Sequence, residues 1–454
     1  MDLIETLRAG LPGDAVLTDP AALGLHTRDS APFGPAGAPA VVARPRTVEQ
    51  VQHVVRTAHA LRVPVVPQGA RTGLAGGANA VDGCVVLSLT GMDRILEIDQ
   101  ANRLVRCEPG VTTRVLADAV AEQGLFYPPD PVSRDTCTIG GNIATGAGGL
   151  CCVKYGVTAD YVLGLGVVLA DGTFTRTGRR TVKGVAGLDL TRLFVGSEGT
   201  LGVIVEATLA LRPARRPALA MLAQFGSAFA AGAAVAAIIA AGHTPSALEL
   251  MDRTTTGAII ELGHPLLSAG AAPTLIVESE DGDLEAIAEL CALAGAVHLE
   301  TARSQQVLEA RRMIGAATLA VLARMKGRPT AFVEDVAVPR GSLAALVDEI
   351  ELIAKSHGLY IAATGHAGDG NLHPLVLFDQ DDPDEVRRAE EAHDAIMAAA
   401  LELGGTITGE HGVGLLKRAW LRRELDPVAF RLQQEIKALF DPAGILNPGK
   451  VLHV

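Results

Sequence analysis

The chain has 454 residues, a formal net charge of -12 and only 3% aromatic side chains. This length exceeds what one hydrophobic core usually organises, so we expect two or more subdomains that share a cleft, which favours an enzyme. The negative charge and the scarcity of aromatic side chains argue against nucleic acid and anionic lipid as partners.

The N-terminal segment predicts a cytoplasmic protein, because Met1 to Glu5 carry no basic or apolar region of a secretion signal. No charged residue occurs between Arg216 and Glu249, a stretch long enough to suggest a membrane span. It divides instead into a strand and an Ala-rich helix that is capped by Ser227 and ended by Gly242. This helix is too short to cross a bilayer, so we expect no transmembrane segment.

The order of predicted elements indicates an α+β fold. Residues 40–211 alternate short apolar runs with Gly-rich turns around one clear helix, 47–61, as in a nucleotide-binding region. Residues 212–217 have the composition of a linker, and we place a domain boundary there. Beyond it we expect a mainly antiparallel sheet with helices over one face. The predicted strands are 219–225, 274–278, 330–338, 359–364 and 374–378, and the predicted helices are 284–293, 342–357 and 383–403.

Three Gly-rich loops punctuate the N-terminal half. The first follows an apolar run and contains Gly69, Gly73, Gly76 and Gly77. Glycines there let the backbone approach a pyrophosphate and adopt positive φ, forming an anion nest. The spacing matches neither a Rossmann fingerprint nor a P-loop, and this loop alone is equally compatible with a surface turn. The other two loops are residues 128–149 and 196–204, and one extended dinucleotide could contact all three.

In these loops and in the segment Asn447-Pro448-Gly449-Lys450, the sequence resembles FAD-linked oxidases of the vanillyl-alcohol oxidase type. Within that family it is similar to the D-lactate, glycolate and D-2-hydroxyglutarate dehydrogenase group. The resemblance implies an FAD-binding domain of the PCMH type at 1–215, with its core at about 37–215, and a C-terminal substrate or cap domain at 216–454. The last segment, about 405–454, would return to the flavin. The first loop has no His to link FAD covalently, so non-covalent FAD is expected.

The resemblance also assigns flavin contacts residue by residue. They are Pro67, Gln68, Gly69, Ala70, Arg71, Thr72, Gly73, Leu74 and Ala75 in the first loop; Pro131, Ser133, Thr138, Ile139, Gly140, Gly141, Asn142, Gly146, Gly148 and Gly149 in the second; Glu198, Gly202, Val203 and Ile204 in the third; and Asn447 near the end of the chain.

A candidate metal site comes from two separate segments. His366 and His373 flank an Asp369-Gly370 turn signal between two apolar runs, so a hairpin would bring the imidazoles together. Glu410 offers a third ligand, which leaves His411 to act as a base. Taken alone, a pair of histidines more often occupies ordinary surface or core positions than it binds a metal. The resemblance implies that His366, His373 and Glu410 bind a divalent metal, zinc or manganese, and that His411 is catalytic and contacts the substrate.

Substrate contacts are expected from Arg311 and Asn371. Arg311 matches a family Arg, and a guanidinium can bind a carboxylate through two hydrogen bonds, although a solvated helix charge is an equally good interpretation. Certain relatives have an Asn where this chain has Leu375, and diacid-specific relatives have a Lys where it has Val333. Both departures argue against a long dicarboxylate substrate.

The predicted function is therefore FAD-dependent, metal-assisted dehydrogenation of a small D-2-hydroxy acid, D-lactate first, then glycolate or D-2-hydroxyglutarate. The electron acceptor, a quinone, a cytochrome or an electron-transfer flavoprotein, stays open, and with it a peripheral membrane location. The oligomeric state is also open, with a homodimer as one option. Two alternatives of other classes remain: a metallohydrolase, and a non-catalytic flavin-binding subunit of a larger complex.

Overall fold

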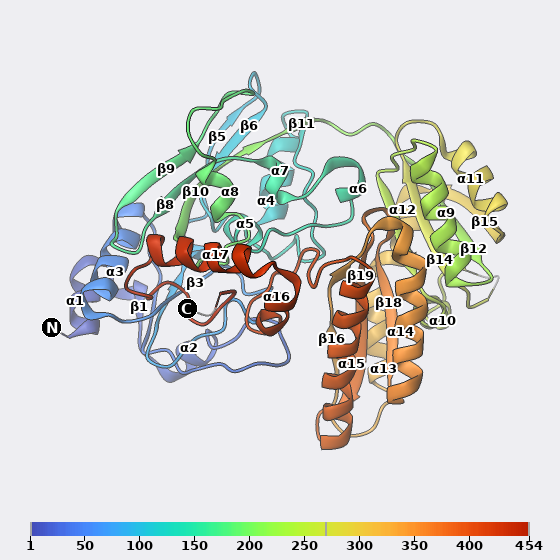
Figure 1. Ribbon diagram of the computed structural model, residues 1–454. Coiled ribbons are helices and arrows are strands. Elements are labelled where there is room, and N and C mark those ends of the chain that lie inside the picture. The colour runs from blue at the N-terminus through green and yellow to red at the C-terminus, as the bar shows by residue number, and fades with distance from the viewer. Residues whose placement is uncertain (1, 268–269, 453–454) are drawn as a thin grey trace. The chain divides into compact units, whose positions relative to one another are not determined.

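The computed structural model describes residues 2–267 and 270–452 (Figure 1). By its contacts the chain forms two compact units. The first comprises the residues up to 148, residues 157–214 and the residues from 410 onward, and the second comprises 149–156 and 215–409. The chain thus leaves the first unit after Ala214 and returns to it at Glu410. The assignment of functional domains to 1–215 and 216–454 stays a prediction.

The first unit contains two larger sheets and one short sheet. The four-stranded sheet has the order β1-β2-β4-β3, with β2, β4 and β3 parallel and β1 antiparallel to β2. The five-stranded sheet, β5-β6-β10-β8-β9, is antiparallel, and β7 pairs with β11. The strands are β1 (Val16–Leu17), β2 (Val41–Ala43), β3 (Val65–Gln68), β4 (Val85–Ser88), β5 (Ile95–Asp99), β6 (Leu104–Cys107), β7 (Leu125–Phe126), β8 (Val162–Val168), β9 (Phe174–Gly178), β10 (Val203–Ala210) and β11 (Arg212–Pro213).

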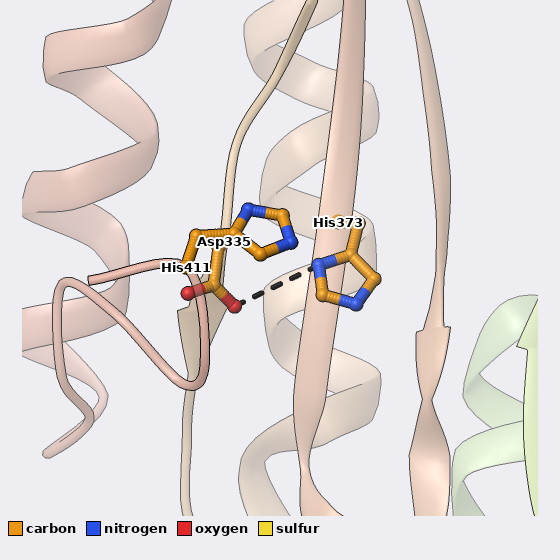
Figure 2. Close-up of side chains that lie close together, drawn as sticks. All are labelled: Asp335, His373 and His411. Carbon is orange, nitrogen blue, oxygen red and sulfur yellow. Dashed lines mark ion pairs between the residues drawn. The ribbon is translucent and has the colours of Figure 1, made fainter. Parts of the chain in front are cut away.

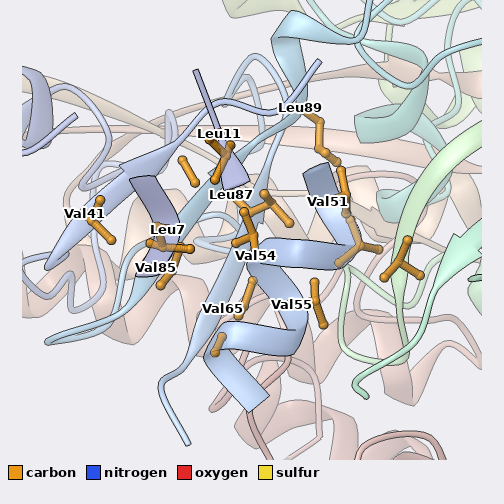
Figure 3. Packing of buried hydrophobic residues seen from close by; sticks show 14 of the residues in the cluster. Leu7, Leu11, Val41, Val51, Val54, Val55, Val65, Val85, Leu87 and Leu89 are labelled. Carbon is orange, nitrogen blue, oxygen red and sulfur yellow. The ribbon is translucent and has the colours of Figure 1, made fainter. Parts of the chain in front are cut away.

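Helix α3 (Val48–Leu61) shows how the first core forms. The Thr47 side chain accepts a hydrogen bond from the Gln50 N–H and so caps the helix. Val51, Val54 and Val55 recur at helical spacing and pack in the cluster that includes the four-stranded sheet (Figure 3). Each fully buried side chain of this size contributes about 1.5–3 kcal/mol. The unit's other helices are α1 (Leu3–Gly10), η1 (Gly13–Ala15), α2 (Pro20–Gly24), η2 (Leu89–Gly91), α4 (Thr113–Ala121), α5 (Ile139–Thr145), α7 (Thr158–Tyr161), α8 (Leu190–Phe194), α16 (Arg418–Glu424) and α17 (Pro427–Phe440).

The second unit is built on one antiparallel sheet with the order β15-β12-β14-β13-β18-β19-β16, and β17 pairs with β19. Its elements are α6 (Cys152–Tyr155), β12 (Leu219–Phe225), α9 (Ala228–Ala240), β13 (Ala247–Met251), α10 (Arg253–Glu261), β14 (Thr274–Ser279), α11 (Leu284–Leu293), β15 (Ala296–Arg303), α12 (Ser304–Arg312), α13 (Ile314–Leu322), β16 (Pro329–Val333), β17 (Val336–Ala337), η3 (Arg340–Ser342), α14 (Leu343–His357), β18 (Tyr360–His366), η4 (Ala367–Asp369), β19 (Asn371–Asp379) and α15 (Pro383–Glu402).

Helices cover both faces of this sheet rather than one. Every residue of β13 and β14 is buried, and neighbouring residues of a strand point to opposite faces. Ala220 and Leu222 of β12 pack with residues of α10, α12 and α13. Helices α9, α11, α14 and α15 contact one another and strands of the sheet, and so form a second layer. The α+β class is confirmed, but the helices are not confined to one face; near-continuous apolar runs such as those of β13 and β14 are typical of strands buried on both faces.

Two further predictions concern single elements. The predicted strand 330–338 is interrupted, because β16 ends at Val333 and β17 begins at Val336, which leaves Glu334 and Asp335 between them. The Ala-rich helix is α9, and Ser227 caps it through a hydrogen bond from the Ala230 N–H, as expected. Across the residues that the structure describes, no helix has the length and apolar character that a membrane crossing requires.

Candidate active site

The three Gly-rich loops meet inside the first unit. Cβ atoms added at Gly69 and Gly199 would lie 2.3 Å from Thr138 Oγ1 and 3.1 Å from Pro67 Cγ, so the first loop touches both others. The second and third loops are joined through the backbone, because the Glu198 N–H donates to the Ala144 carbonyl at 2.8 Å. The three loops that carry the predicted flavin contacts therefore touch one another within this unit, except that Gly149 belongs to the second unit by its contacts.

The glycines of the first loop serve close packing more than unusual backbone angles. Of its four glycines only Gly76 has positive φ, at 77°, whereas the non-glycine Arg71 has φ of 60°. At Gly77 a Cβ would lie 2.4 Å from Glu198 Oε2. The expected positive φ angles are thus wrong for Gly69, Gly73 and Gly77. At Gly69 and Gly77 the close approach of Thr138 and Glu198 requires a residue without a Cβ, whereas at Gly73 a Cβ would make an ordinary contact, 3.5 Å from Asp29 Oδ2.

The chain's last segment ties the first and third loops together. Asn447 Nδ2 donates to the carbonyls of Gly77 at 2.9 Å and Glu198 at 2.7 Å. The Glu198 carboxylate accepts from the backbone N–H groups of Val413 and Gly414. Burial raises the pKa of Glu198 to about 7, although these N–H groups favour its charged form. Lys450 Nζ donates to the Asn79 carbonyl, and burial lowers its pKa to about 8.

In the second unit, β18 and β19 form the predicted hairpin around η4. Their register pairs Thr364 with His373 and His366 with Asn371. The His366 and His373 rings meet edge to face, with centroids 5.2 Å apart, and both residues are buried. Gly370 completes the turn at φ of 76°. The hairpin therefore brings together the two imidazoles that the sequence places seven residues apart.

Residues 406–409 lead from this sheet to Glu410 and His411. Thr406 bridges to Ala337, and Thr408 Oγ1 donates to Asp335 Oδ2 at 2.7 Å, which holds this loop on the second unit. Glu410 follows Gly409 directly, so the chain itself keeps Glu410 close to the hairpin. His366, His373 and Glu410 each present one ligand atom, and these atoms lie within 4.8 Å of one another. A tetrahedral metal with an open position suits such a set.

Asp335 lies next to the second imidazole (Figure 2). Its Oδ1 is 3.6 Å from His373 Nδ1, and a second group of possible ligands combines Asp335, His373 and His411. Asp335 Oδ1 also accepts from Asn371 Nδ2 at 2.7 Å. The hydrogen bonds from Asn371 and Thr408 fix both Asp335 oxygens beside His373, and a carboxylate can accept more bonds than these two.

Glu249 of β13 connects the first imidazole to Arg311. Its Oε1 lies 2.6 Å from His366 Nδ1, and its Oε2 accepts from Arg311 Nε at 2.8 Å. The carboxylate is fully buried, which opposes ionisation, but His366 and Arg311 together hold its pKa below the ordinary value. Arg311 itself lies near the end of α12, and helix α13 follows directly after it.

The remaining predicted substrate contact, Asn371, is buried, and its amide hydrogens bond Asp335 and the Val336 carbonyl. Its contact with a substrate stays a prediction. Glu249, Asp335 and Thr408 are not among the site residues predicted from the sequence. Glu249 could have been noticed as the single charge in the apolar run Ala247–Met251, because a carboxylate in a buried strand needs a partner.

The family follows from the whole chain. A family model described as FAD linked oxidases, C-terminal domain, matches residues 215–451, and an FAD binding domain matches residues 39–178. The chain belongs to the FAD-linked oxidases. This FAD-linked oxidase is 43% identical to glycolate oxidase subunit GlcD of Bacillus subtilis (strain 168), over 91% of this chain and 89% of that protein.

Two other proteins give further points of comparison. The FAD-linked oxidase is 36% identical to a probable mitochondrial D-lactate dehydrogenase of Danio rerio, over 92% of this chain and 85% of that protein. Its fold matches 4-ethylphenol oxidase of Gulosibacter chungangensis with a TM-score of 0.81 at 21% identity, over 99% and 96% of the two chains. The predicted family and the two-part fold of the vanillyl-alcohol oxidase type are confirmed.

Proposed function

We propose that this FAD-linked oxidase dehydrogenates a small D-2-hydroxy acid, D-lactate in the first place, to the corresponding 2-oxo acid and passes the electrons to a separate acceptor. The observation that carries the proposal is the group of His366, His373 and Glu410, with a further imidazole next in the chain at His411. The names of the relatives, glycolate oxidase and D-lactate dehydrogenase, support the same substrate class.

The first unit supplies residues that fit FAD. Its three loops present backbone with few side chains, and Cβ atoms at Gly69 and Gly77 would collide with Thr138 and Glu198. The backbone N–H groups of such loops can bind the phosphates of a long cofactor. The first loop contains no His that could attach the cofactor covalently. When bound, non-covalent FAD accepts a hydride from the substrate carbon.

His366, His373 and Glu410 would hold a divalent cation, zinc or manganese, which would lower the pKa of the substrate hydroxyl. His411 accepts the hydroxyl proton as general base. Arg311 binds the substrate carboxylate, since a guanidinium offers two parallel N–H donors. The substrate thus loses one proton and one hydride and becomes a 2-oxo acid.

The substrate's size follows from two apolar residues. Val333 of β16 and Leu375 of β19 are register partners, so the position with a Lys in diacid-specific relatives lies beside the one with an Asn in certain relatives. An apolar pair leaves a second carboxylate without a hydrogen-bonding partner, and burying it there would be costly. A short monocarboxylate such as lactate or glycolate therefore fits better than 2-hydroxyglutarate.

The direct test is anaerobic mixing of the purified protein with 2-hydroxy acids of each hand, with and without a chelator, while the flavin absorbance is followed. We expect D-lactate to bleach the flavin and the chelator to slow the bleaching. His411→Ala should keep its flavin but slow substrate reduction of the flavin by about 10²–10⁴-fold, the usual contribution of a general base. A near-normal rate in this variant would remove His411 from the proposed chemistry.

Glycolate is the second candidate, because the most identical of the relatives named above is a glycolate oxidase subunit. It has no handed carbon, so bleaching by glycolate together with weak bleaching by both lactates would select it. A protein that carries no flavin as purified would instead favour a metallohydrolase. Bound flavin that no 2-hydroxy acid reduces would favour a non-catalytic subunit.

A further inference from the structure

The buried contacts of Glu249 lie entirely within the second unit. The register pairs Leu250 of β13 with Gly365 of β18, which sets Glu249 beside His366. The Glu249 side chain is 1% exposed, and its two oxygens are divided between two donors: Oε1 faces His366 Nδ1 at 2.6 Å and Oε2 accepts from Arg311 Nε at 2.8 Å. One carboxylate therefore touches a predicted metal ligand and a predicted substrate contact.

These contacts determine where the His366 imidazole carries its hydrogen. An ionised carboxylate can only accept hydrogen bonds, so Nδ1 of His366 donates to Glu249. In a neutral imidazole Nε2 then has its lone pair available for a cation. Glutamine could not replace Glu249 without loss, because its amide has a single acceptor oxygen and one of the two donors would face an NH₂ group.

Stability alone does not account for this arrangement. Removing two charges from water costs about as much as their attraction returns, and apolar pairs of similar volume are often as stable. Asp335 offers the comparison within the same sheet, because its nearest approach to His373 Nδ1 is 3.6 Å, longer than a hydrogen bond. Glu249 Oε1 lies closer to its imidazole, 2.6 Å from His366 Nδ1.

We propose that Glu249 is a positioning residue that orients His366 for metal binding and holds Arg311 for the substrate carboxylate, so that both binding events depend on one buried carboxylate. This inference rests on the proposed function, since it takes His366 as a ligand and Arg311 as a substrate contact. It predicts that loss of Glu249 weakens two kinds of ligand at once.

The test uses the oxidised, flavin-loaded protein after removal of metal with a chelator. Calorimetric titration with Zn²⁺ or Mn²⁺ measures metal affinity, and perturbation of the flavin spectrum by oxalate measures anion binding. Glu249→Gln should weaken metal binding by about 10–100-fold, as loss of an outer-sphere partner does, and should also weaken oxalate binding. Arg311→Met should weaken oxalate binding and change metal affinity by less than about 3-fold, because His366 keeps its acceptor.

Glu278→Gln is the matched control. Glu278 is also buried and ion-paired, but its partners are Arg215, Ser246 and Ser304. A merely structural effect would lower thermal stability in both Gln variants without a selective loss of metal. If Glu249→Gln does not fold, the double variant Glu249→Leu/Arg311→Met removes both charges together and carries the same expectation for metal affinity.

The possible outcomes distinguish a failure of the role of Glu249 from a failure of the proposed metal-assisted function. Unchanged metal affinity in Glu249→Gln, or a loss no greater than in Glu278→Gln, would overturn the role of Glu249 while the proposed function stands. A wild-type protein that binds neither metal ion, yet whose flavin is reduced by a 2-hydroxy acid, would instead overturn metal assistance itself.

Discussion

The candidate binding regions of the two units are made of different chemical groups. In the first unit the candidate flavin region is made of backbone and glycine, and the loops meet where a Cβ at Gly69 or Gly77 would collide with a neighbour. In the second unit the candidate site is made of buried charged and polar side chains, such as Glu249, Asp335 and His366. The difference teaches that loops with few side chains leave room for a long cofactor, whereas the proposed cation would depend on a few side chains that are held in fixed positions.

The largest expected effect separates the two regions. His366→Ala removes an imidazole from the proposed metal group, so metal affinity should fall by more than about 100-fold, beyond the loss typical of an outer-sphere partner. Flavin content should stay at the wild-type level, because the flavin loops belong to the other unit. Metal titration and the absorbance ratio of flavin to protein measure both. A parallel loss of flavin would mean that the regions are not independent.

A change in the first unit should lower the affinity for FAD and leave the affinity for metal unchanged. At Gly140 a Cβ would lie 2.5 Å from Pro109 Cβ, whereas at Gly141 it would meet only Thr138 Oγ1 at 3.2 Å. Gly140→Ala should therefore lower the free energy of unfolding by about 1–3 kcal/mol through overpacking and should reduce FAD affinity. Metal affinity should not change.

Gly141→Ala is the comparison for this change. Thermal unfolding of the flavin-free proteins should distinguish the two variants, with Gly141→Ala the closer to wild type. Equal destabilisation would show that the contact with Pro109 is not the cause.

The smallest expected effect is a pH dependence of the free energy of unfolding. The pKa of Glu198 is raised to about 7, above the ordinary value of 4.5, so its protonation favours the folded state. That stability is present in full below pH 4.5 and is lost as the pH rises through 7. Between pH 6 and 8 the loss should be on the order of 1 kcal/mol.

Glu198→Gln should remove this slope, since an amide does not titrate. The urea midpoint of both proteins, measured at pH 6 and pH 8, gives the comparison. Equal slopes in the two proteins would contradict the raised pKa of Glu198.

The same contrast explains what could be predicted from the sequence. The glycine loops are local, so their residues stand together in the chain and signal their role through spacing and lack of side chains. Helix α3 and its cap at Thr47 were predictable for the same reason. The His366 and His373 pair was also local, because one hairpin turn joins the two strands.

Glu249 and Asp335 could not be predicted in this way. Glu249 reaches His366 only because β13 pairs with β18, more than a hundred residues later in the chain. Asp335 lies where a strand that looked continuous is interrupted, and its partners Asn371 and Thr408 come from other segments. Such contacts depend on strand register across the sheet, and periodicity within one segment carries no information about that register.

The order of segments in the first unit has a consequence for biosynthesis. Val65 of β3 donates to the Ile445 carbonyl, and the Asn447 N–H donates back to Val65. A ribosome makes Val65 long before Ile445, and the whole second unit emerges between them. The second unit can therefore fold while translation continues, whereas the flavin region is completed only after Ile445 and Asn447 leave the exit tunnel. Nascent chains stalled before Ile445 should for this reason fail to retain flavin.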